Sequence, residues 1–224
     1  PRQNKLTSLF DTGWSIVRFD NGFELLFKSG DTCPKHLPAH AHSDLLSIDI
    51  FKNGKPIILE TGTSNYGLNP IREYERSSAA HNVFQLALLP ISKKQKINWI
   101  EPIETWGNFR AARKAKIIKK SNGISHNGIV WLKGSHDDYE RFGDRYTRSV
   151  ELEEKINGEV SLMILDEVIC KKRMCWRQFW HLAPNQSHEL FDKTIKYLKL
   201  KSTQVKKKNF SFTNVQKKIG FYMQ

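Results

Sequence analysis

Apolar and polar positions alternate along most of the chain in short segments, and turn residues separate one segment from the next. Within each segment, β-branched and aromatic residues recur at every second position, which is typical of strands with one buried face. Longer stretches of helical periodicity are scarce. The predicted strands are residues 14–19, 23–28, 46–51, 56–59, 82–86, 128–132, 146–152 and 160–168.

Asn-Gly pairs stand between several of these strands. Asn-Gly is favoured in two-residue hairpins because both turn positions need a positive φ. Hairpin connections make neighbouring strands antiparallel, and many antiparallel strands usually close into a sandwich or a barrel. The sequence therefore predicts an all-β fold with four tight turns, at Asn21-Gly22, Asn53-Gly54, Asn122-Gly123 and Asn157-Gly158.

Two short stretches carry the little helical periodicity that is present, residues 73–80 and residues 109–116. Each would form a turn or two of helix. The Lys-rich tail from 194 to 224 still alternates, with Phe210, Phe212 and Val215 as apolar positions, so we expect edge strands there.

The chain has 224 residues, enough for one large two-sheet domain with a sizeable core. Hydrophobic residues make up 39% and charged residues 26%, as in globular proteins. No apolar run approaches the ~20 residues that span a bilayer, and the first residues lack the apolar core of a signal peptide. Because the chain starts at Pro1, we expect upstream sequence in the full protein.

The net charge of +13 favours a polyanionic partner, either a nucleic acid or an acidic glycan. The basic runs lack interleaved stacking aromatics, and no RNA-binding signature is present, which disfavours nucleic acid. The three cysteines, Cys33, Cys170 and Cys175, form no CxxC motif. No disulfide framework is expected, and Cys170 and Cys175 are expected to be small buried apolar residues.

Histidines and acids gather in the segment from Pro38 to Val83. His40 and His42 are two residues apart, so on a strand both would lie on one face. Glu60 follows a strand-like run, and His81 follows a polar turn. Imidazoles with one carboxylate suit zinc or a similar divalent ion. Isolated HxH pairs are common, so spacing alone leaves structural histidines as the alternative.

The same segment closely resembles the heparinase II/III-like family, in which HxHxD is followed by a strand ending in D-x-G-T, then by Tyr-Gly, then by R-S-x-x-x-H-N. Here these elements are His40-Ala41-His42-Ser43-Asp44, Glu60-Thr61-Gly62-Thr63, Tyr66-Gly67 and Arg76-Ser77-Ser78-Ala79-Ala80-His81-Asn82. Weaker matches follow at His136-Asp137-Asp138-Tyr139 and Phe179-Trp180-His181-Leu182. The resemblance implies a large antiparallel β-sandwich of the super-sandwich type.

The resemblance also implies a zinc site held by His42, Glu60 and His81. Glu60 stands where the family usually has aspartate, and its carboxylate reaches one methylene further, which bears on how tightly zinc would bind. The first histidine of the motif, His40, corresponds to a residue of the family's catalytic cleft. Asp44 is expected on the same strand face, where it would orient a histidine by accepting its second N–H.

Two further residues are candidate contacts for substrate. Arg76 would bind a carboxylate through its guanidinium fork, with a salt bridge to Glu73 or Glu75 as the equal alternative. Tyr66 is a local phenol that could approach the cleft, as is Tyr139, and packing within the strands and turns is the alternative for both.

By resemblance, the chain is the C-terminal domain of a polysaccharide lyase that cleaves an acidic, uronic-acid-containing glycan by β-elimination. The family's other catalytic groups come from an upstream α/α-toroid, which this chain lacks, so its own N-terminal helical domain is an expected partner. The resemblance points to the periplasm or cell envelope as the location. The alternative is a non-catalytic carbohydrate-binding or structural module that keeps the fold and the metal site.

Overall fold

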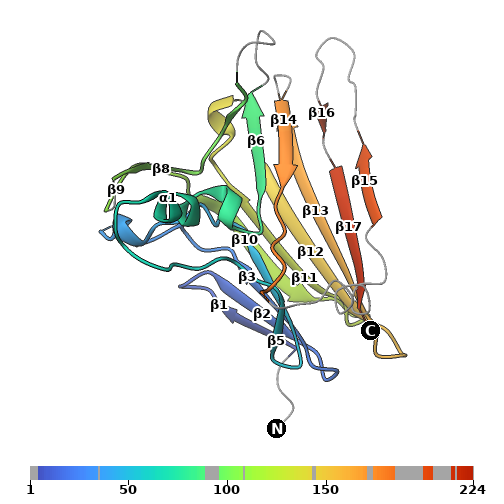
Figure 1. Ribbon diagram of the computed structural model, residues 1–224. Coiled ribbons are helices and arrows are strands. Elements are labelled where there is room, and N and C mark those ends of the chain that lie inside the picture. The colour runs from blue at the N-terminus through green and yellow to red at the C-terminus, as the bar shows by residue number, and fades with distance from the viewer. Residues whose placement is uncertain are drawn as a thin grey trace.

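A computed structural model of the chain describes residues 5–34, 36–88, 96–107, 109–142, 145–170, 174–184, 199–203, 213–214 and 216–223. For residues 169–170 and for those from 199 onward, only the backbone is described. Every strand pairing among these residues is antiparallel. The all-β sandwich class predicted from the alternating pattern is thus confirmed (Figure 1).

A five-stranded sheet forms the first layer, with its strands in chain order. In its central strand every second side chain is buried, because one face of the sheet lies on the core. The strands are β1 (Leu6–Leu9), β2 (Trp14–Arg18), β3 (Phe23–Lys28), β4 (Ile48–Lys52) and β5 (Lys55–Ile58).

A seven-stranded sheet forms the second layer and carries the longest strands (Figure 1). Its order is β10, β11, β12, β13, β17, β15, and β16 pairs with β13. The expectation of strands in the Lys-rich tail holds for β15 and β17, while Phe210, Phe212 and Val215 lie outside the described residues. The bounds are β10 (Ile117–Ile124), β11 (Val130–His136), β12 (Tyr146–Glu154), β13 (Val160–Cys170), β15 (Lys199–Thr203), β16 (Thr213–Asn214) and β17 (Gln216–Met223).

Two small sheets complete the strands. One has the order β14 (Met174–Gln178), β6 (Phe84–Leu88), β7 (Asn98–Trp99), and the other pairs β8 (Ile103–Trp106) with β9 (Arg110–Lys114). The expected helix at residues 109–116 is therefore wrong. Pairing with β8 decides the structure of this segment, and such tertiary pairing commonly overrides weak helical periodicity.

The helices are short and lie at one end of the molecule. They are η1 (Pro38–His40), α1 (Pro70–Arg76), η2 (Ser78–Ala80) and η3 (Glu140–Phe142). The Asn69 side chain caps α1 by accepting the N–H of Arg72, and Pro70 occupies the first helical position, where its missing N–H costs nothing. The expected helix at 73–80 is thus shifted and split at Ser77, whose backbone is extended.

Three of the four predicted Asn-Gly turns join the strands as expected, and the fourth is wrong. In the turn between β4 and β5, Asn53 and Gly54 both have positive φ, 50° and 73°. Asn122 and Gly123 lie instead inside β10, and the hairpin to β11 turns at Asn127-Gly128. A Cβ added to Gly123 would lie 2.8 Å from the Trp131 ring on β11, so close packing explains that glycine.

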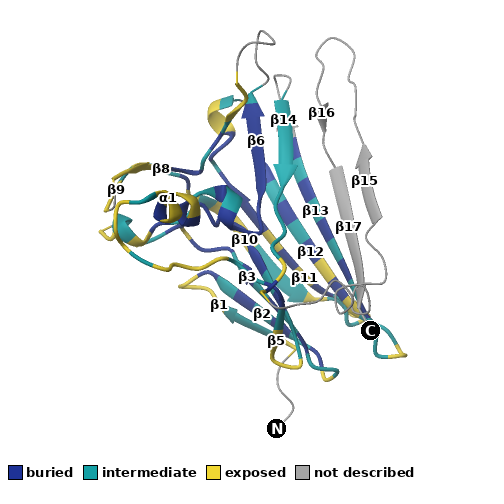
Figure 2. Ribbon diagram, in the orientation of Figure 1, coloured by how far each residue is buried: buried dark blue, intermediate teal, exposed yellow. Residues whose placement is uncertain are grey.

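The core lies between the two large sheets (Figure 2). Apolar side chains of β2, β3 and β4 meet those of β11, β12 and β13, and burial of this apolar surface is the main term that favours folding. The fully buried residues of this core include Val17, Leu25, Ile48, Ile50, Val130, Val150, Leu152, Leu162 and Ile164. Cys33 and Cys175 are free thiols. Cys175 is half-buried, so the expectation of a fully buried residue is wrong for it, and the side chain of Cys170 lies outside the described residues.

A charged group lies within this apolar core. The Arg148 guanidinium, 0% exposed, makes two bonds to the Asp166 carboxylate of 2.7 and 2.9 Å. It also donates to the backbone carbonyls of Leu46 and Asn82, at 2.9 and 2.8 Å. Arg148 thereby ties β12 and β13 to the loops that carry the histidines. No helix among the described residues is long and apolar enough to cross a membrane.

Candidate functional site

Loops at the end of the five-stranded sheet converge on one region beside α1 and η2 (Figure 1). The N–H of Ser43 donates to the carbonyl of Arg76 at 2.9 Å, and the N–H of Thr61 donates to that of Ala80 at 3.3 Å. The N–H of Leu59 donates to the His181 carbonyl at 3.1 Å. These backbone bonds join the loop of His42, the loop of Glu60 and the helices α1 and η2 to one another, and they join the chain that leaves β14 to the end of β5.

His40 and His42 do not lie on a strand, so that expectation is wrong. His40 ends η1, and the chain from Ala41 to Ser47 is a loop closed by bonds to α1 and β3. The alternation at residues 40–44 is too short to form a strand without a pairing partner. The two imidazoles therefore have different neighbours instead of a shared strand face.

His40 is exposed and pairs with an exposed tyrosine. The Nδ1 of His40 lies 3.4 Å from the Tyr66 hydroxyl, and the two rings meet edge to face with centroids 5.4 Å apart. The Tyr66 side chain is 46% exposed. Of the two phenols that the sequence offered, Tyr139 is buried, with its hydroxyl donating to the Phe84 carbonyl at 3.2 Å. Only Tyr66 of these two is thus open to a ligand.

His42 lies next to Arg72, which is 2% exposed. The Nη1 of Arg72 is 3.1 Å from Nε2 of His42. Since a guanidinium only donates, His42 Nε2 must accept, which is the role of a neutral imidazole protonated at Nδ1. Burial, together with the nearby His81 ring, lowers the pKa of His42 to about 4, in agreement with that protonation state.

Arg72 also joins the two histidine neighbourhoods. Its guanidinium lies over the Tyr66 ring, 5.0 Å from the centroid, and its Nη2 donates to the carbonyl of Ala39 at 3.1 Å. The buried Arg72 thereby contacts His42, Tyr66 and the backbone of η1.

His81 and Glu60 meet below His42. Nδ1 of His81, a residue 1% exposed, is 3.1 Å from Oε2 of Glu60, and the His81 and His42 rings are 5.3 Å apart. Burial opposes the charged imidazole, but the contact with Glu60 outweighs it and raises the pKa of His81. Nε2 of His81 and Oε1 of Glu60 have no hydrogen-bond partner among the described residues.

A second carboxylate, which the sequence did not single out, adds negative charge to this cluster. Oδ1 of Asp49 accepts the backbone N–H of Glu60 at 3.0 Å. Burial and the neighbouring Glu60 raise the pKa of Asp49 to about 6. Two carboxylates and two imidazoles thus share a partly buried space, where an unpaired charge is costly.

The donor set matches the chemistry of zinc, which takes imidazole nitrogens and carboxylate oxygens. A buried nitrogen of His81, Nε2, and a buried oxygen of Glu60, Oε1, are without partners, as expected of ligands whose bonds go to an ion. As the side chains stand, no trio of His, Cys, Asp or Glu in the described part of the chain has the geometry to hold an ion. His42 points its Nε2 at Arg72. The predicted ligands are therefore together, but not arranged as a closed metal site.

The two remaining candidates have structural partners. Arg76, 3% exposed, donates to the backbone carbonyls of Ala41, Gly107 and Pro38 at 3.1, 3.1 and 3.3 Å, and so fixes the loop of the histidines. Asp44 pairs with Lys28. Its role in orienting a histidine stays a prediction, as does contact of Arg76 with substrate.

Sequence reasoning missed Arg72 and His181. The Asn69-Pro70 pair is a helix-start signal, and a helix beginning there puts Arg72 and Arg76 one turn apart on one face. His181 bonds at 2.8 Å through Nε2 to the Ala79 carbonyl, and its Nδ1 is 3.1 Å from Oδ1 of Asn82. No local signal indicated that contact, because β14 brings His181 there from a distant part of the chain.

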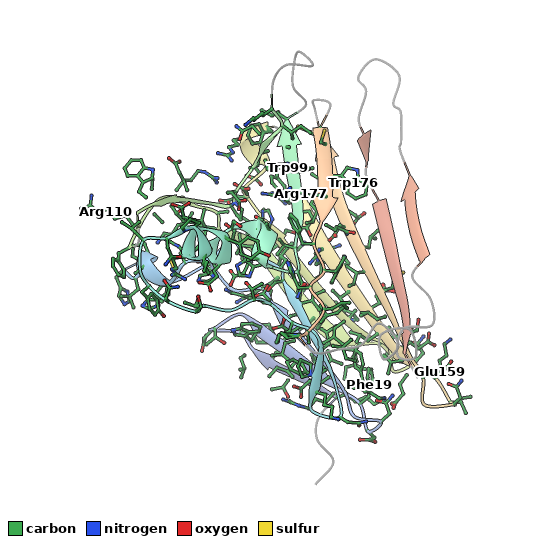
Figure 3. The ribbon with its side chains drawn as sticks, viewed as in Figure 1. Phe19, Trp99, Arg110, Glu159, Trp176 and Arg177 are labelled. Carbon is green, nitrogen blue, oxygen red and sulfur yellow. The ribbon has the colours of Figure 1, made fainter. Side chains whose placement is uncertain are left out.

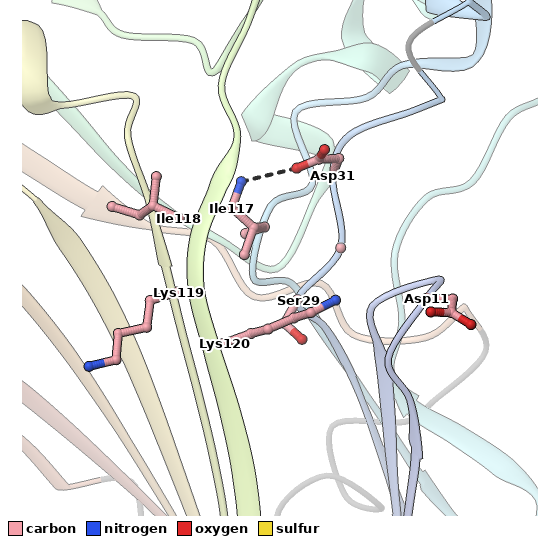
Figure 4. Close-up of a pocket in the computed structure, with 8 residues that line it drawn as sticks. Asp11, Ser29, Asp31, Ile117, Ile118, Lys119 and Lys120 are labelled. Atoms are coloured by element: carbon pink, nitrogen blue, oxygen red, sulfur yellow. Dashed lines mark hydrogen bonds between the residues drawn. The ribbon is translucent and has the colours of Figure 1, made fainter.

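Three pockets of the surface are lined by residues other than these histidines. A pocket of about 330 Å³ opens between the loop after β3 and the start of β10, where Asp11, Asp31, Lys119 and Lys120 line it (Figure 4). Two further pockets adjoin Cys33 and the β2–β3 and β4–β5 turns. His40 and Tyr66 are thus exposed at a part of the surface that these three pockets do not include.

Three solved structures share the fold. A heparinase III, the BT4657 gene product, has a TM-score of 0.57 at 14% identity, over 100% of this chain and 34% of that one. Another heparinase III has 0.55 at 12%, over 100% and 35%. A mutant of the heparan sulfate lyase HepC from Pedobacter heparinus has 0.55 at 14%, over 100% and 34%. The chain spans about a third of the length of these proteins.

No curated protein matches the sequence. The family model described as heparinase II/III-like, C-terminal, matches residues 1–219, almost the whole chain. This match agrees with the motif resemblance between His40 and Asn82 and with the shared sandwich fold. The chain therefore belongs to the heparinase II/III-like family, as its C-terminal domain.

Proposed function

We propose that this domain is part of a polysaccharide lyase that cleaves an acidic, uronic-acid-containing glycan by β-elimination. The observation that carries the proposal is the exposed pair of His40 and Tyr66, whose Nδ1 and hydroxyl oxygen are 3.4 Å apart above the buried Arg72. The net charge of +13 is in keeping with a polyanionic substrate.

The reaction requires groups of these kinds. A base removes the proton on C5 of the uronate, the C4–O bond breaks as a C4=C5 double bond forms, and an acid returns a proton to the leaving oxygen. A positive or hydrogen-bonding group must also neutralise the carboxylate while charge develops. His40 would neutralise the carboxylate or assist proton transfer, and Tyr66, within hydrogen-bond reach of it, would orient its ring and contact the sugar.

Arg72 supports this arrangement from below. Its guanidinium packs on the face of the Tyr66 ring and donates to the η1 backbone just before His40. Both partners of the exposed pair are therefore anchored to one buried cation. A catalytic pair needs such support, since small misplacements of reacting groups cost large factors in rate.

Zinc would be held by His42, Glu60 and His81, with Arg72 withdrawn from His42 Nε2. When bound, it would supply a fixed positive charge that orders the histidine loops and offsets the Glu60 and Asp49 carboxylates. The glutamate at position 60 lengthens one ligand by a methylene, and the unpartnered Oε1 supports its availability. The proposed roles of His40 and Tyr66 in the reaction do not depend on a direct contact with zinc.

The second wall of the cleft and the tyrosine that acts as base and acid would come from an upstream N-terminal helical domain. The fraction of the heparinase structures that this chain covers, 34–35%, supports such a partner. The open surface around His40 and Tyr66 supports the same arrangement, because a lone wall cannot exclude water from the reaction.

The test uses the full-length protein with heparan sulfate, alginate and other acidic glycans, and it follows the absorbance of the unsaturated uronide. We expect His40→Ala to lower kcat/KM by ~10²–10⁴, as removal of one positioned acid-base or charge-neutralising group does. His126→Ala, which alters an exposed histidine in the β10–β11 turn, is the matched control and should leave the rate unchanged.

Metal analysis of the same variants separates the roles. His40→Ala should keep its zinc, whereas His42→Ala should lose it. A His40→Ala enzyme with near-normal rates, or one that loses metal as His42→Ala does, would refute the assignment. If the wild-type protein binds acidic glycans but never yields the unsaturated product, the domain is a non-catalytic carbohydrate-binding module.

A further inference from the structure

A row of planar side chains lies on one face of the β14 chain, apart from the residues assigned so far. Arg177, Phe179 and His181 alternate along it and so share one face. The Arg177 guanidinium carbon is 4.6 Å from the Phe179 centroid, and the Phe179 and His181 rings stack at 6.3 Å. Figure 3 shows Arg177 beside Trp99, over the β6–β14 pair.

The Arg177 guanidinium is held in a fixed orientation. Its carbon lies 3.9 Å from the centroid of the Trp99 ring, on β7, which pairs with the far side of β6. Its Nε donates to Oε1 of Gln85 at 2.8 Å. Gln85 is fully buried, and its Nε2 donates to Oε1 of Glu101 at 2.7 Å and to the Ile100 carbonyl at 3.1 Å. The amide of Gln85 can therefore only present its oxygen to Arg177.

The rest of the guanidinium is available to a ligand. Arg177 is half-buried, and its two terminal nitrogens have no hydrogen-bond partner or ion pair among the described residues. The nearest acid, Glu101, is already engaged, because its Oε1 accepts from Gln85 and its Oε2 accepts from the N–H and hydroxyl of Ser78. A guanidinium with Nε anchored and both terminal groups free matches the two oxygens of a carboxylate or a sulfate.

This row ends beside the loop that carries His81. From Arg177 the row runs through Phe179 to His181, whose Nε2 bonds to the carbonyl of Ala79. Ala79 belongs to η2, which directly precedes His81. A bound chain of sugars that reaches His40 and Tyr66 can thus extend along this face.

We propose that Arg177, oriented by Trp99, Phe179 and Gln85, is an oxyanion subsite for the acidic glycan, binding a carboxylate or sulfate group on a sugar next to the one that reacts. The ligand class rests on the proposed function, but the subsite acts in binding and takes no part in the chemical step. Aromatic neighbours and a buried anchor reduce the entropy that Arg177 loses on binding.

The experiment measures binding of heparan sulfate oligosaccharides to the full-length protein by calorimetry, beside kcat and KM for the same glycan. Arg177→Gln should weaken binding about 10- to 100-fold, the usual range for loss of charge-assisted hydrogen bonds. KM should rise by a similar factor, with kcat within about threefold. Arg177→Lys keeps the charge without the fork and should recover only part of the affinity.

Arg145→Gln is the matched control, since Arg145 is an exposed arginine that pairs with Glu140 and contacts none of Arg177, Phe179 or His181 in the described structure. Trp99→Leu leaves Arg177 in place but loosens it, and should weaken binding less than Arg177→Gln does. Thermal unfolding of each variant must match the wild type. A desulfated oligosaccharide of the same backbone distinguishes a sulfate ligand from a carboxylate ligand. If Arg177 binds a sulfate, Arg177→Gln should no longer weaken binding of the desulfated oligosaccharide. If Arg177 binds a carboxylate, the loss of affinity should remain.

Wild-type affinity in Arg177→Gln, or an equal loss in Arg145→Gln, overturns the subsite. The two proposals fail separately. If the protein binds the oligosaccharide through Arg177 but forms no unsaturated product, the subsite stands and the lyase function falls. If it cleaves the glycan and Arg177→Gln changes neither affinity nor KM, the lyase function stands and the subsite falls.

Discussion

Two clusters of charged groups lie close together in this domain, and they differ in how completely their hydrogen bonds are satisfied. In the first, Arg148 has four bonds to Asp166 and to two backbone carbonyls, with Tyr146 adding its hydroxyl to Asp166 at 2.7 Å. In the second, His81 and Glu60 are in contact, but Nε2 of His81 and Oε1 of Glu60 are buried without partners among the described residues.

This difference separates a structural cluster from a candidate functional one. Buried polar groups without partners are costly and rare, so a fold that keeps several together usually offers them to a ligand. The saturated Arg148 cluster joins the seven-stranded sheet to the backbone at Leu46, four residues after His42, and at Asn82, directly after His81. The Arg148 cluster therefore holds the loops in place. The second, unsaturated cluster of His81 and Glu60 lies on those loops and is available to a ligand.

The largest expected effect follows from breaking the saturated cluster. Arg148→Met should lower the free energy of unfolding by about 3–5 kcal/mol, because it leaves the Asp166 carboxylate buried without its cation. Urea unfolding followed by circular dichroism measures this. The double variant Arg148→Met/Asp166→Leu should recover much of the loss, since both charges are then absent. Arg145→Met, which breaks the exposed pair with Glu140, should cost less than about 1 kcal/mol. Equal losses at the two arginines would contradict the comparison.

The next effect tests whether the unsaturated cluster takes an ion. Zinc added at about 100 times its Kd should stabilise the wild-type protein by about 2.7 kcal/mol, the value for one site that exists only in the folded state. Thermal unfolding with and without zinc measures it. His81→Ala should abolish the zinc-induced shift, while His126→Ala should keep it. A shift of the same size in both variants would place the ion elsewhere.

A smaller effect concerns a histidine packed against the saturated cluster. Burial, with the Arg148 charge, lowers the pKa of His136 from 6.5 to about 3. The unfolded chain therefore binds more protons than the folded one between these values, so stability falls as pH falls below about 6.5. From pH 7 to pH 5 this group should cost about 2 kcal/mol.

The pH effect is isolated by comparison with His136→Asn, which keeps an acceptor for the Asp138 N–H that now bonds to Nδ1 at 3.3 Å. Unfolding free energies of both proteins are measured across this pH range. The variant should lose stability less steeply on acidification, whatever its stability at pH 7. Parallel curves would show that His136 does not contribute to the acid response.

The sequence by itself determined β2 to β6 and β11 to β13, together with three of the four predicted turns, but it did not predict β1, β7 to β10 or β14. Alternation and Asn-Gly pairs are local signals, since side-chain direction and turn φ depend on neighbouring residues. They failed at Asn122-Gly123, where the glycine is required by the Trp131 ring on another strand, and at residues 109–116, where pairing with β8 decides the conformation.

The candidate site was predicted from its motifs, and the structure brings His42, Glu60 and His81 together. Only the tertiary structure decided that His40 and His42 stand on a loop with separate partners, that Arg72 lies between them, and that His181 and Arg177 arrive on a distant strand. Motif spacing fixes which residues are near in sequence. Hydrogen bonds and ring contacts between segments that are far apart in sequence form only when the sheets pack, so no local pattern records them.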